Sequence, residues 1–71
     1  MGFVTTAAEI IAFLASNGYH KETGGNHGVK MVKGGNRIPI PMHRRDLKTG
    51  TASGILAQAG YTINDLMNWR R

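Results

Sequence analysis

Residues 27–42 read HGVKMVKGGNRIPIPM, and this stretch decides the fold. Polar and apolar residues alternate closely enough over residues 27–33 to predict a β-strand. Gly34-Gly35-Asn36 follows and is typical of a hairpin turn. Residues 37–42 then form another strand, whose apolar face holds Ile38, Ile40 and Met42. The stretch therefore predicts an antiparallel hairpin with one apolar face.

Two prolines predict where the last strand lies in the sheet. Pro39 and Pro41 have no backbone N–H, and both missing donors face the same lateral side of the strand. Two gaps on one side are tolerated only where that side has no neighbouring strand. Residues 19–23 also have strand character, and Gly24-Gly25-Asn26 forms a connecting turn. We therefore expect a three-stranded antiparallel meander with residues 37–42 at an edge.

A helix is predicted before the strands, over residues 6–17. Thr6-Ala7-Ala8-Glu9 has the form of a capping box, in which the Thr6 hydroxyl accepts from the Glu9 amide and the Glu9 side chain reaches back to the cap. Gly18 ends the helix, because glycine adopts the left-handed conformation without a steric penalty. One face of this helix is apolar and contains Ala7, Ile10, Ile11 and Leu14.

Two more helices are predicted after the strands. The first ends at Gly60, and its apolar face contains Ala52, Ile55, Leu56 and Ala59. The second begins at residues 62–65 and carries Leu66, Met67 and Trp69. We expect Trp69 and the methionines to fill the core, and Arg70 and Arg71 to form a frayed end. The order α-β-β-β-α with a short C-terminal helix predicts an α+β fold, with helices packed on one face of the sheet.

Length and composition restrict the class of protein. The 71 residues are enough for one domain, which we expect to span residues 1–71, and 41% of them are hydrophobic, as in globular proteins. The chain has no cysteine, so disulfides and thiolate metal sites are excluded. The apolar run at residues 10–15 is far shorter than the roughly 20 residues of a membrane span. No signal-peptide pattern is present, and we expect a cytoplasmic protein.

Positive charge is concentrated in the middle of the chain. The formal net charge is +5, and residues 20–48 alone hold seven basic and two acidic side chains. Such a region attracts polyanions by releasing their condensed counterions. The charge favours a nucleic-acid partner, and a solvated surface that keeps the protein in solution remains the alternative.

The three histidines also lie in this basic region, and His27 is the one at a turn that enters a strand. An imidazole titrates near pH 6.5, so it exchanges protons at neutral pH. The residues alone leave a second interpretation open, in which His27 shares strand parity with Val29 and Met31 and packs on the core. His20 and His43 are expected at the surface. The histidines and the four acidic residues show no metal-ligand spacing, so no metal site is expected.

Five short motifs, taken in order, resemble the HicA family of toxins over about residues 8–66. They are Gly25-Asn26-His27, Ile40-Pro41-Met42-His43, Leu47-Lys48-Thr49-Gly50-Thr51, Ile55-Leu56 and Gln58-Ala59-Gly60. The resemblance implies a fold similar to double-stranded-RNA-binding domains, or dsRBD-like. The family usually has serine before its histidine, whereas this chain has Asn26.

The resemblance further implies an activity and partners. It implies an endoribonuclease that cleaves mRNA without a metal or other cofactor and is inhibited by a HicB-like antitoxin protein. The matched histidine is His27, which would act as general base, while His27, His43 or water protonates the leaving oxygen. RNA phosphates are expected to contact Lys30, Lys33, Arg37, Arg44, Arg45 and Lys48.

Two other functions fit the same residues. The first is a non-catalytic RNA-binding module with the same dsRBD-like domain. The second is a structural or partner-binding protein whose basic face meets an acidic protein surface. Cleavage of labelled RNA in the presence of chelator separates the toxin from both.

Overall fold

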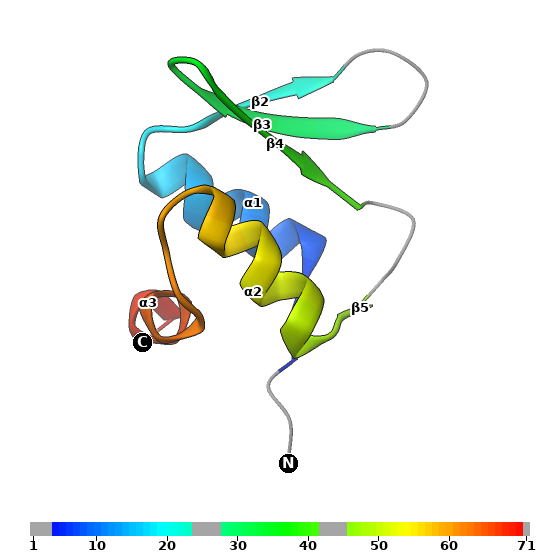
Figure 1. Cartoon of the computed structure of the whole chain (residues 1–71), viewed down its shortest axis with the longest axis vertical. Coiled ribbons are helices and arrows are strands. Elements are labelled where there is room, and N and C mark those ends of the chain that lie inside the picture. Colours follow the sequence, from blue (N-terminus) through cyan, green and yellow to red (C-terminus); the bar gives the residue numbers. More distant parts are fainter. Residues whose placement is uncertain (1–3, 24–27, 42–45, 71) are drawn as a thin grey trace.

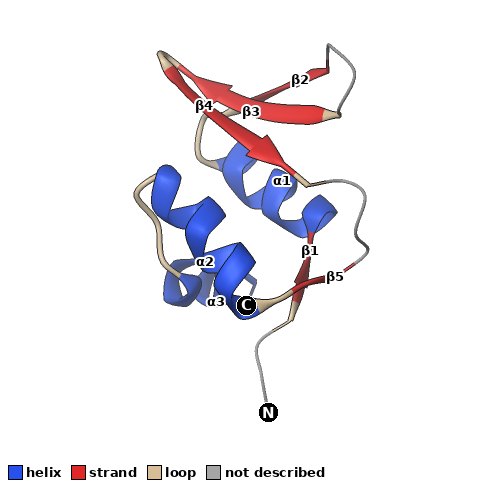
Figure 2. Cartoon of the chain, turned by 45° about the vertical axis from the view of Figure 1, so that its right-hand side comes forward, coloured by secondary structure: helices blue, strands red, loops and turns tan. Residues whose placement is uncertain are grey.

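Three helices, a three-stranded antiparallel sheet and a two-stranded sheet form the described part of the computed structural model, which comprises residues 4–23, 28–41 and 46–70 (Figure 1). This is the predicted α+β, dsRBD-like arrangement. The helices lie together on one face of the sheet, and the other face is not covered by any of them (Figure 2).

The sheet has the predicted order, β2 (His20–Thr23), β3 (Val29–Lys33) and β4 (Asn36–Ile40), with β4 at an edge. The turn between β3 and β4 is shorter than predicted. Asn36 pairs with Lys33, so only Gly34 and Gly35 form the loop, and Gly34 has the positive φ of 59° that tight hairpin loops use. β4 ends at Ile40, which leaves Pro41 outside the strand.

Helix α1 (Ala7–Ser16) ends close to where the sequence predicts. The Glu9 amide donates to the Thr6 hydroxyl over 3.1 Å, as expected of a capping box. Gly18 has a φ of 93°, and the next amide, of Tyr19, donates back to the Leu14 carbonyl over 3.1 Å. This 6→1 hydrogen bond with a left-handed glycine is the geometry that ends many helices.

The two later helices follow the same rules. Helix α2 (Thr49–Gln58) is followed by Gly60 at a φ of 84°, and the Tyr61 amide donates to the Leu56 carbonyl over 2.9 Å. Helix α3 (Ile63–Arg70) begins with a complete capping box. The Thr62 amide donates to the Asp65 carboxylate over 2.8 Å, and the Asp65 amide donates to the Thr62 hydroxyl over 3.2 Å.

One hydrophobic cluster joins the helices to the covered face of the sheet. All three helices and strands β3 and β4 contribute to it. Its largest fully buried apolar side chains are Ile10, Leu14, Met31, Ile38, Leu47, Leu56 and Leu66. The prediction that Ile38 and Ile40 share the apolar face of the last strand is confirmed, while Met42 lies outside the described residues.

A second, two-stranded sheet was not predicted. β1 (Thr5–Thr6) pairs antiparallel with β5 (Asp46–Leu47), and Figure 2 shows both at the end of α1 that lies away from β2. The pairing brings Leu47, which is 1% exposed, into the core. It therefore anchors the chain between the sheet and α2.

The prediction that Arg70 belongs to a frayed end is wrong. The Arg70 guanidinium donates to both oxygens of the Glu9 carboxylate, with its Nε at 2.6 Å from Oε2, and to the Val4 carbonyl over 2.9 Å. The Thr5 hydroxyl also donates to Glu9. The Glu9 side chain therefore does not complete the predicted capping box, because it binds Arg70 and Thr5 instead. This ion pair ties α3 to α1 and β1.

The ion pair makes a pH-dependent contribution to stability. The Arg70 guanidinium holds the pKa of Glu9 below its ordinary value of 4.5, and the Thr5 hydroxyl assists. A carboxylate with a lowered pKa stabilises the fold above its unfolded-state pKa, and this stabilisation is lost as the pH falls through the folded-state pKa. We expect Arg70→Gln to have a lower Tm than the wild type at pH 7, and the difference to shrink below about pH 4.5. Thermal melts from pH 7 to pH 3 measure this, with Arg37→Gln as the charge-matched control. A Tm difference that does not change with pH would show that Glu9 is not the partner.

Candidate nucleic-acid interface

The open face of the sheet carries the basic side chains that the structure brings together. Residues opposite each other in antiparallel strands point to the same face. His20, Val32 and Arg37 form one such row, and Glu22, Lys30 and Pro39 form the next. Lys30 and Arg37 are exposed diagonal neighbours on this face. The exposed His20, at the surface as predicted, lies 3.2 Å from Glu22.

Lys33 is separated from this group, because its side chain points to the same face of the sheet as Met31, opposite to that of Lys30. Its ammonium donates to the Asn17 carbonyl at the end of α1 over 3.0 Å and lies 5.7 Å from the centre of the Tyr19 ring. The cation thus satisfies a terminal helix carbonyl and interacts favourably with the helix dipole. These contacts hold the Lys33 side chain at the end of α1.

Lys48 lies at the N-terminal cap of α2, between β5 and the helix, where Figure 1 shows the chain well away from β2. Its side chain is exposed and makes no capping hydrogen bond, and the first turn of α2 contains no acidic residue. A helix N-terminus with a neighbouring cation and no acidic residue in its first turn is favourable for a phosphate group. The described residues predicted to contact RNA thus lie in two separate places. Lys30 and Arg37 lie on the open face of the sheet, and Lys48 lies at the start of α2.

His27, Arg44 and Arg45 lie outside the described residues, as does His43. The residues that flank these segments are described, and they meet at one end of the sheet. Val29 pairs with Thr23 on one side and with Ile40 on the other. Thr23 and Gly28 flank residues 24–27, and Pro41, next to Ile40, precedes residues 42–45. Both segments therefore start from the same end of the sheet, beside Lys30.

Within residues 4–23, 28–41 and 46–70, no group of three or more histidine, cysteine, aspartate or glutamate side chains is placed to hold a metal ion. None of the helices in those ranges has the length and apolarity needed to cross a membrane.

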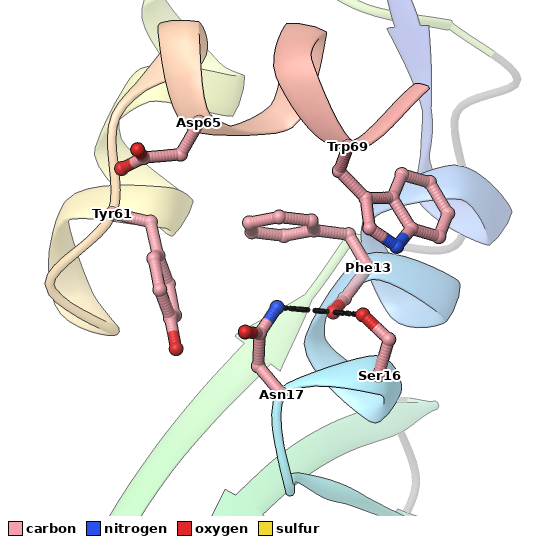
Figure 3. A pocket seen from close by; sticks show the side chains of 6 residues that line it. All are labelled: Phe13, Ser16, Asn17, Tyr61, Asp65 and Trp69. Carbon is pink, nitrogen blue, oxygen red and sulfur yellow. Dashed lines mark hydrogen bonds between the residues drawn. The ribbon is translucent and has the colours of Figure 1, made fainter. Parts of the chain in front are cut away.

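A surface hollow, which the sequence did not indicate, lies between α1 and α3 (Figure 3). Its volume is about 470 Å³. The ring of Phe13 lies between two other aromatic rings, with centroid distances of 5.1 Å to Tyr61 and 5.6 Å to Trp69. The other lining residues are Ser16, Asn17 and Asp65. Trp69 was expected in the core, but it is 40% exposed because it forms a wall of this hollow.

Comparison with known proteins identifies one family. A family model described as "HicA toxin of bacterial toxin-antitoxin" matches residues 7–61, which include the whole sheet, α1 and α2. Helix α3 follows the matched residues. No curated protein and no solved structure matches the chain.

Proposed function

The chain belongs to the HicA toxin family of bacterial toxin–antitoxin systems, and on this premise we propose that it is an endoribonuclease that cleaves mRNA without a metal ion. His27 is its general base. The whole chain, residues 1–71, acts as one domain in the cytoplasm, where mRNA is translated, and a HicB-like antitoxin holds it inactive.

The observation that supports this proposal is that the described residues which flank two segments of the chain lie at one end of the sheet, beside Lys30. The segment containing His27 and the segment containing Arg44 and Arg45 leave the sheet at the row Thr23, Val29 and Ile40. Lys30 is the next residue along β3 and faces the uncovered side. We therefore propose that His27 and the cations of this end of the sheet act together on a phosphodiester.

The proposed reaction is an internal transfer at phosphorus. Neutral His27 accepts the proton of a ribose 2′-hydroxyl, and the 2′-oxygen forms a bond to the adjacent phosphorus. The bond from phosphorus to the 5′-oxygen breaks, and that oxygen takes up a proton. The products are a 2′,3′-cyclic phosphate and a 5′-hydroxyl end. In this proposal Lys30 balances the negative charge that develops on the phosphate oxygens.

RNA binding in this proposal depends on phosphates. A-form helices are recognised mainly by shape and through phosphate and 2′-hydroxyl contacts. Lys30 and Arg37 supply cations from the open face, Lys48 from the start of α2, and Arg44 and Arg45 from the segment after β4. Lys33 supplies a further cation from the end of α1, because its ammonium is exposed and the Asn17 carbonyl uses one of its three donors.

We expect Arg37→Gln to weaken RNA binding equally for different sequences. The slope of log K against log salt concentration is negative, and loss of one phosphate contact should make it shallower by about 0.7–0.9. Fluorescence anisotropy with labelled RNA at several salt concentrations measures this slope. Arg70→Gln is the matched control, because Arg70 lies on α3 and pairs with Glu9. Equal salt-dependence slopes for the wild type and Arg37→Gln would show that Arg37 on the open face does not contact RNA phosphates.

The toxin function is tested in cells. Induction of the chain should arrest growth and deplete full-length mRNA, and co-expression of its antitoxin should restore growth. Normal growth with intact mRNA during induction would contradict the proposal.

A further inference from the structure

The two outer edges of the three-stranded sheet differ in the backbone groups that they expose. Hydrogen-bonded and non-hydrogen-bonded pairs alternate along an antiparallel ladder. The loop between β3 and β4 has two residues, so its closing pair, Lys33 with Asn36, is hydrogen-bonded. Lys30 with Pro39 is then a pair without hydrogen bonds, which agrees with the missing N–H of proline. Pro39 therefore leaves the outer edge of β4 without a donor, and a further strand pairs poorly there.

The outer edge of β2 keeps its donors by the same rule. Lys30 directs its backbone groups away from β4, so its partner Glu22 is hydrogen-bonded to β3. The residues on either side of Glu22, Lys21 and Thr23, then direct their N–H and C=O groups outwards. The amide of Tyr19 follows the same pattern, because it donates to the end of α1 and not to β3. Within the described residues, no strand or helix pairs with Lys21 or Thr23 on this outer side.

The side chains of β2 disfavour pairing with β2 of a second copy. All four of them are exposed. In one antiparallel register of two copies, Glu22 faces Glu22, and in the register two residues away, Lys21 faces Lys21. Like charges directly opposite each other destabilise a strand pair, and charged side chains on an edge strand prevent self-association. The edge is therefore open to a strand of different sequence.

We propose that the outer edge of β2 receives a β-strand of the antitoxin, which extends the sheet beside β2. Backbone hydrogen bonds to Lys21 and Thr23 supply the affinity, as in other complexes formed by strand addition. The side chains select the sequence, because an antiparallel partner needs a basic residue opposite Glu22, followed by an acidic residue opposite Lys21. The inference rests on the proposed pairing with an antitoxin, which family membership supports, and not on the nuclease chemistry.

The position of this edge connects antitoxin binding with inhibition. Thr23 is the residue directly before the segment 24–27, which contains His27. A strand paired with Thr23 therefore lies at the end of the sheet to which the nuclease site is assigned above. The basic face with Lys30 and Arg37 stays uncovered, because an added strand extends the sheet sideways.

Hydrogen exchange followed by NMR tests the proposal in the complex of this chain with its co-expressed antitoxin. In the free chain, the outward amides of Lys21 and Thr23 should exchange faster than the Glu22 amide, which is bonded to β3. Binding of the antitoxin should slow the exchange of both outward amides by about tenfold or more. The amide of Arg37, which faces outwards on β4, is the matched control and should keep its rate.

A pair of variants tests the same contact through affinity. Thr23→Pro removes one outward donor and leaves the ladder between β2 and β3 intact, as Pro39 does at the opposite edge. We expect this variant to bind the purified antitoxin about tenfold more weakly than the wild type. Thr23→Val keeps the donor, so its Kd should change by less than about twofold. If Thr23→Pro unfolds, the exchange rates of the wild-type complex still decide.

Several outcomes would overturn the proposal. They are unchanged exchange of the Lys21 and Thr23 amides in a complex that forms, equal affinities of Thr23→Pro and the wild type, and protection of both amides in the free chain at rising concentration. The last result would assign the edge to a second copy. If no complex forms, the proposed antitoxin fails together with this inference. No RNA is present, so loss of the nuclease activity leaves all of these results unchanged.

Discussion

His27→Ala is expected to reduce the rate of RNA cleavage by about 10²–10⁴, the usual contribution of a positioned general base. RNA affinity should stay close to that of the wild type, because the proposed phosphate contacts are made by lysine and arginine side chains. Single-turnover cleavage of a labelled RNA measures the chemical step, and anisotropy with the same RNA measures binding. The combination of normal binding and lost cleavage is the signature of a catalytic imidazole.

His20→Ala is the matched control for this variant. His20 is an exposed imidazole on the open face of the sheet, 3.2 Å from Glu22, and its loss removes the same kind of side chain from the same basic region. We expect it to cleave RNA at nearly the wild-type rate. Wild-type cleavage by His27→Ala, or an equal loss in both variants, would mean that His27 is not the general base.

The second large effect concerns the attachment of α3 to the core. Leu66→Ala should lower the free energy of unfolding by about 2–5 kcal/mol, because Leu66 is 0% exposed and its removal leaves a cavity. A chain of 71 residues has a total stability of roughly 4–11 kcal/mol, so this variant loses a large share of it. Urea denaturation followed by circular dichroism measures the change.

Met67→Ala is the neighbouring control on the same helix. Met67 is 41% exposed, and we expect its replacement to change stability by less than about 0.5 kcal/mol. Similar losses for Leu66→Ala and Met67→Ala would show that α3 does not dock as described. The hollow beside Trp69 would then also lose one of its walls.

Features with a local cause were predictable from the sequence. The Thr6 cap, Gly18 and Gly60 define the ends of helices through contacts within a few residues. The position of β4 at the sheet edge follows from proline chemistry at Pro39. Each of these features depends on backbone groups close in sequence, so the pattern of residues is sufficient to indicate it.

Features made by distant residues were not predictable in the same way. The pairing of β1 with β5 involves strands of two residues, which are too short for any alternation to be recognised. Arg70 contacts Glu9 across 61 positions, and an arginine near the end of a chain has no local sign of such a partner. Trp69 has helical spacing from Leu66, yet only the packing of α3 on α1 decides that its ring lies at the surface.

The candidate site was predictable in part. Lys30 and Arg37 lie together because the observed register pairs Lys30 with Pro39 and Val32 with Arg37. The longer turn predicted from the sequence does not give this register. The contact between Lys33 and the Asn17 carbonyl was not predictable, because it depends on how β3 packs against the end of α1, and the RNA contact of Lys33 stays a prediction. The role of His27 follows from the resemblance to the family and stays a prediction.

Nuclease activity is measured most directly by incubating the purified protein with one labelled RNA of defined sequence in excess chelator. The ends of the fragments are then analysed. We predict discrete fragments with 2′,3′-cyclic phosphate and 5′-hydroxyl ends, formed by the wild type and not by His27→Ala. Intact RNA that is nevertheless bound by the protein would contradict the account and identify a binding module instead.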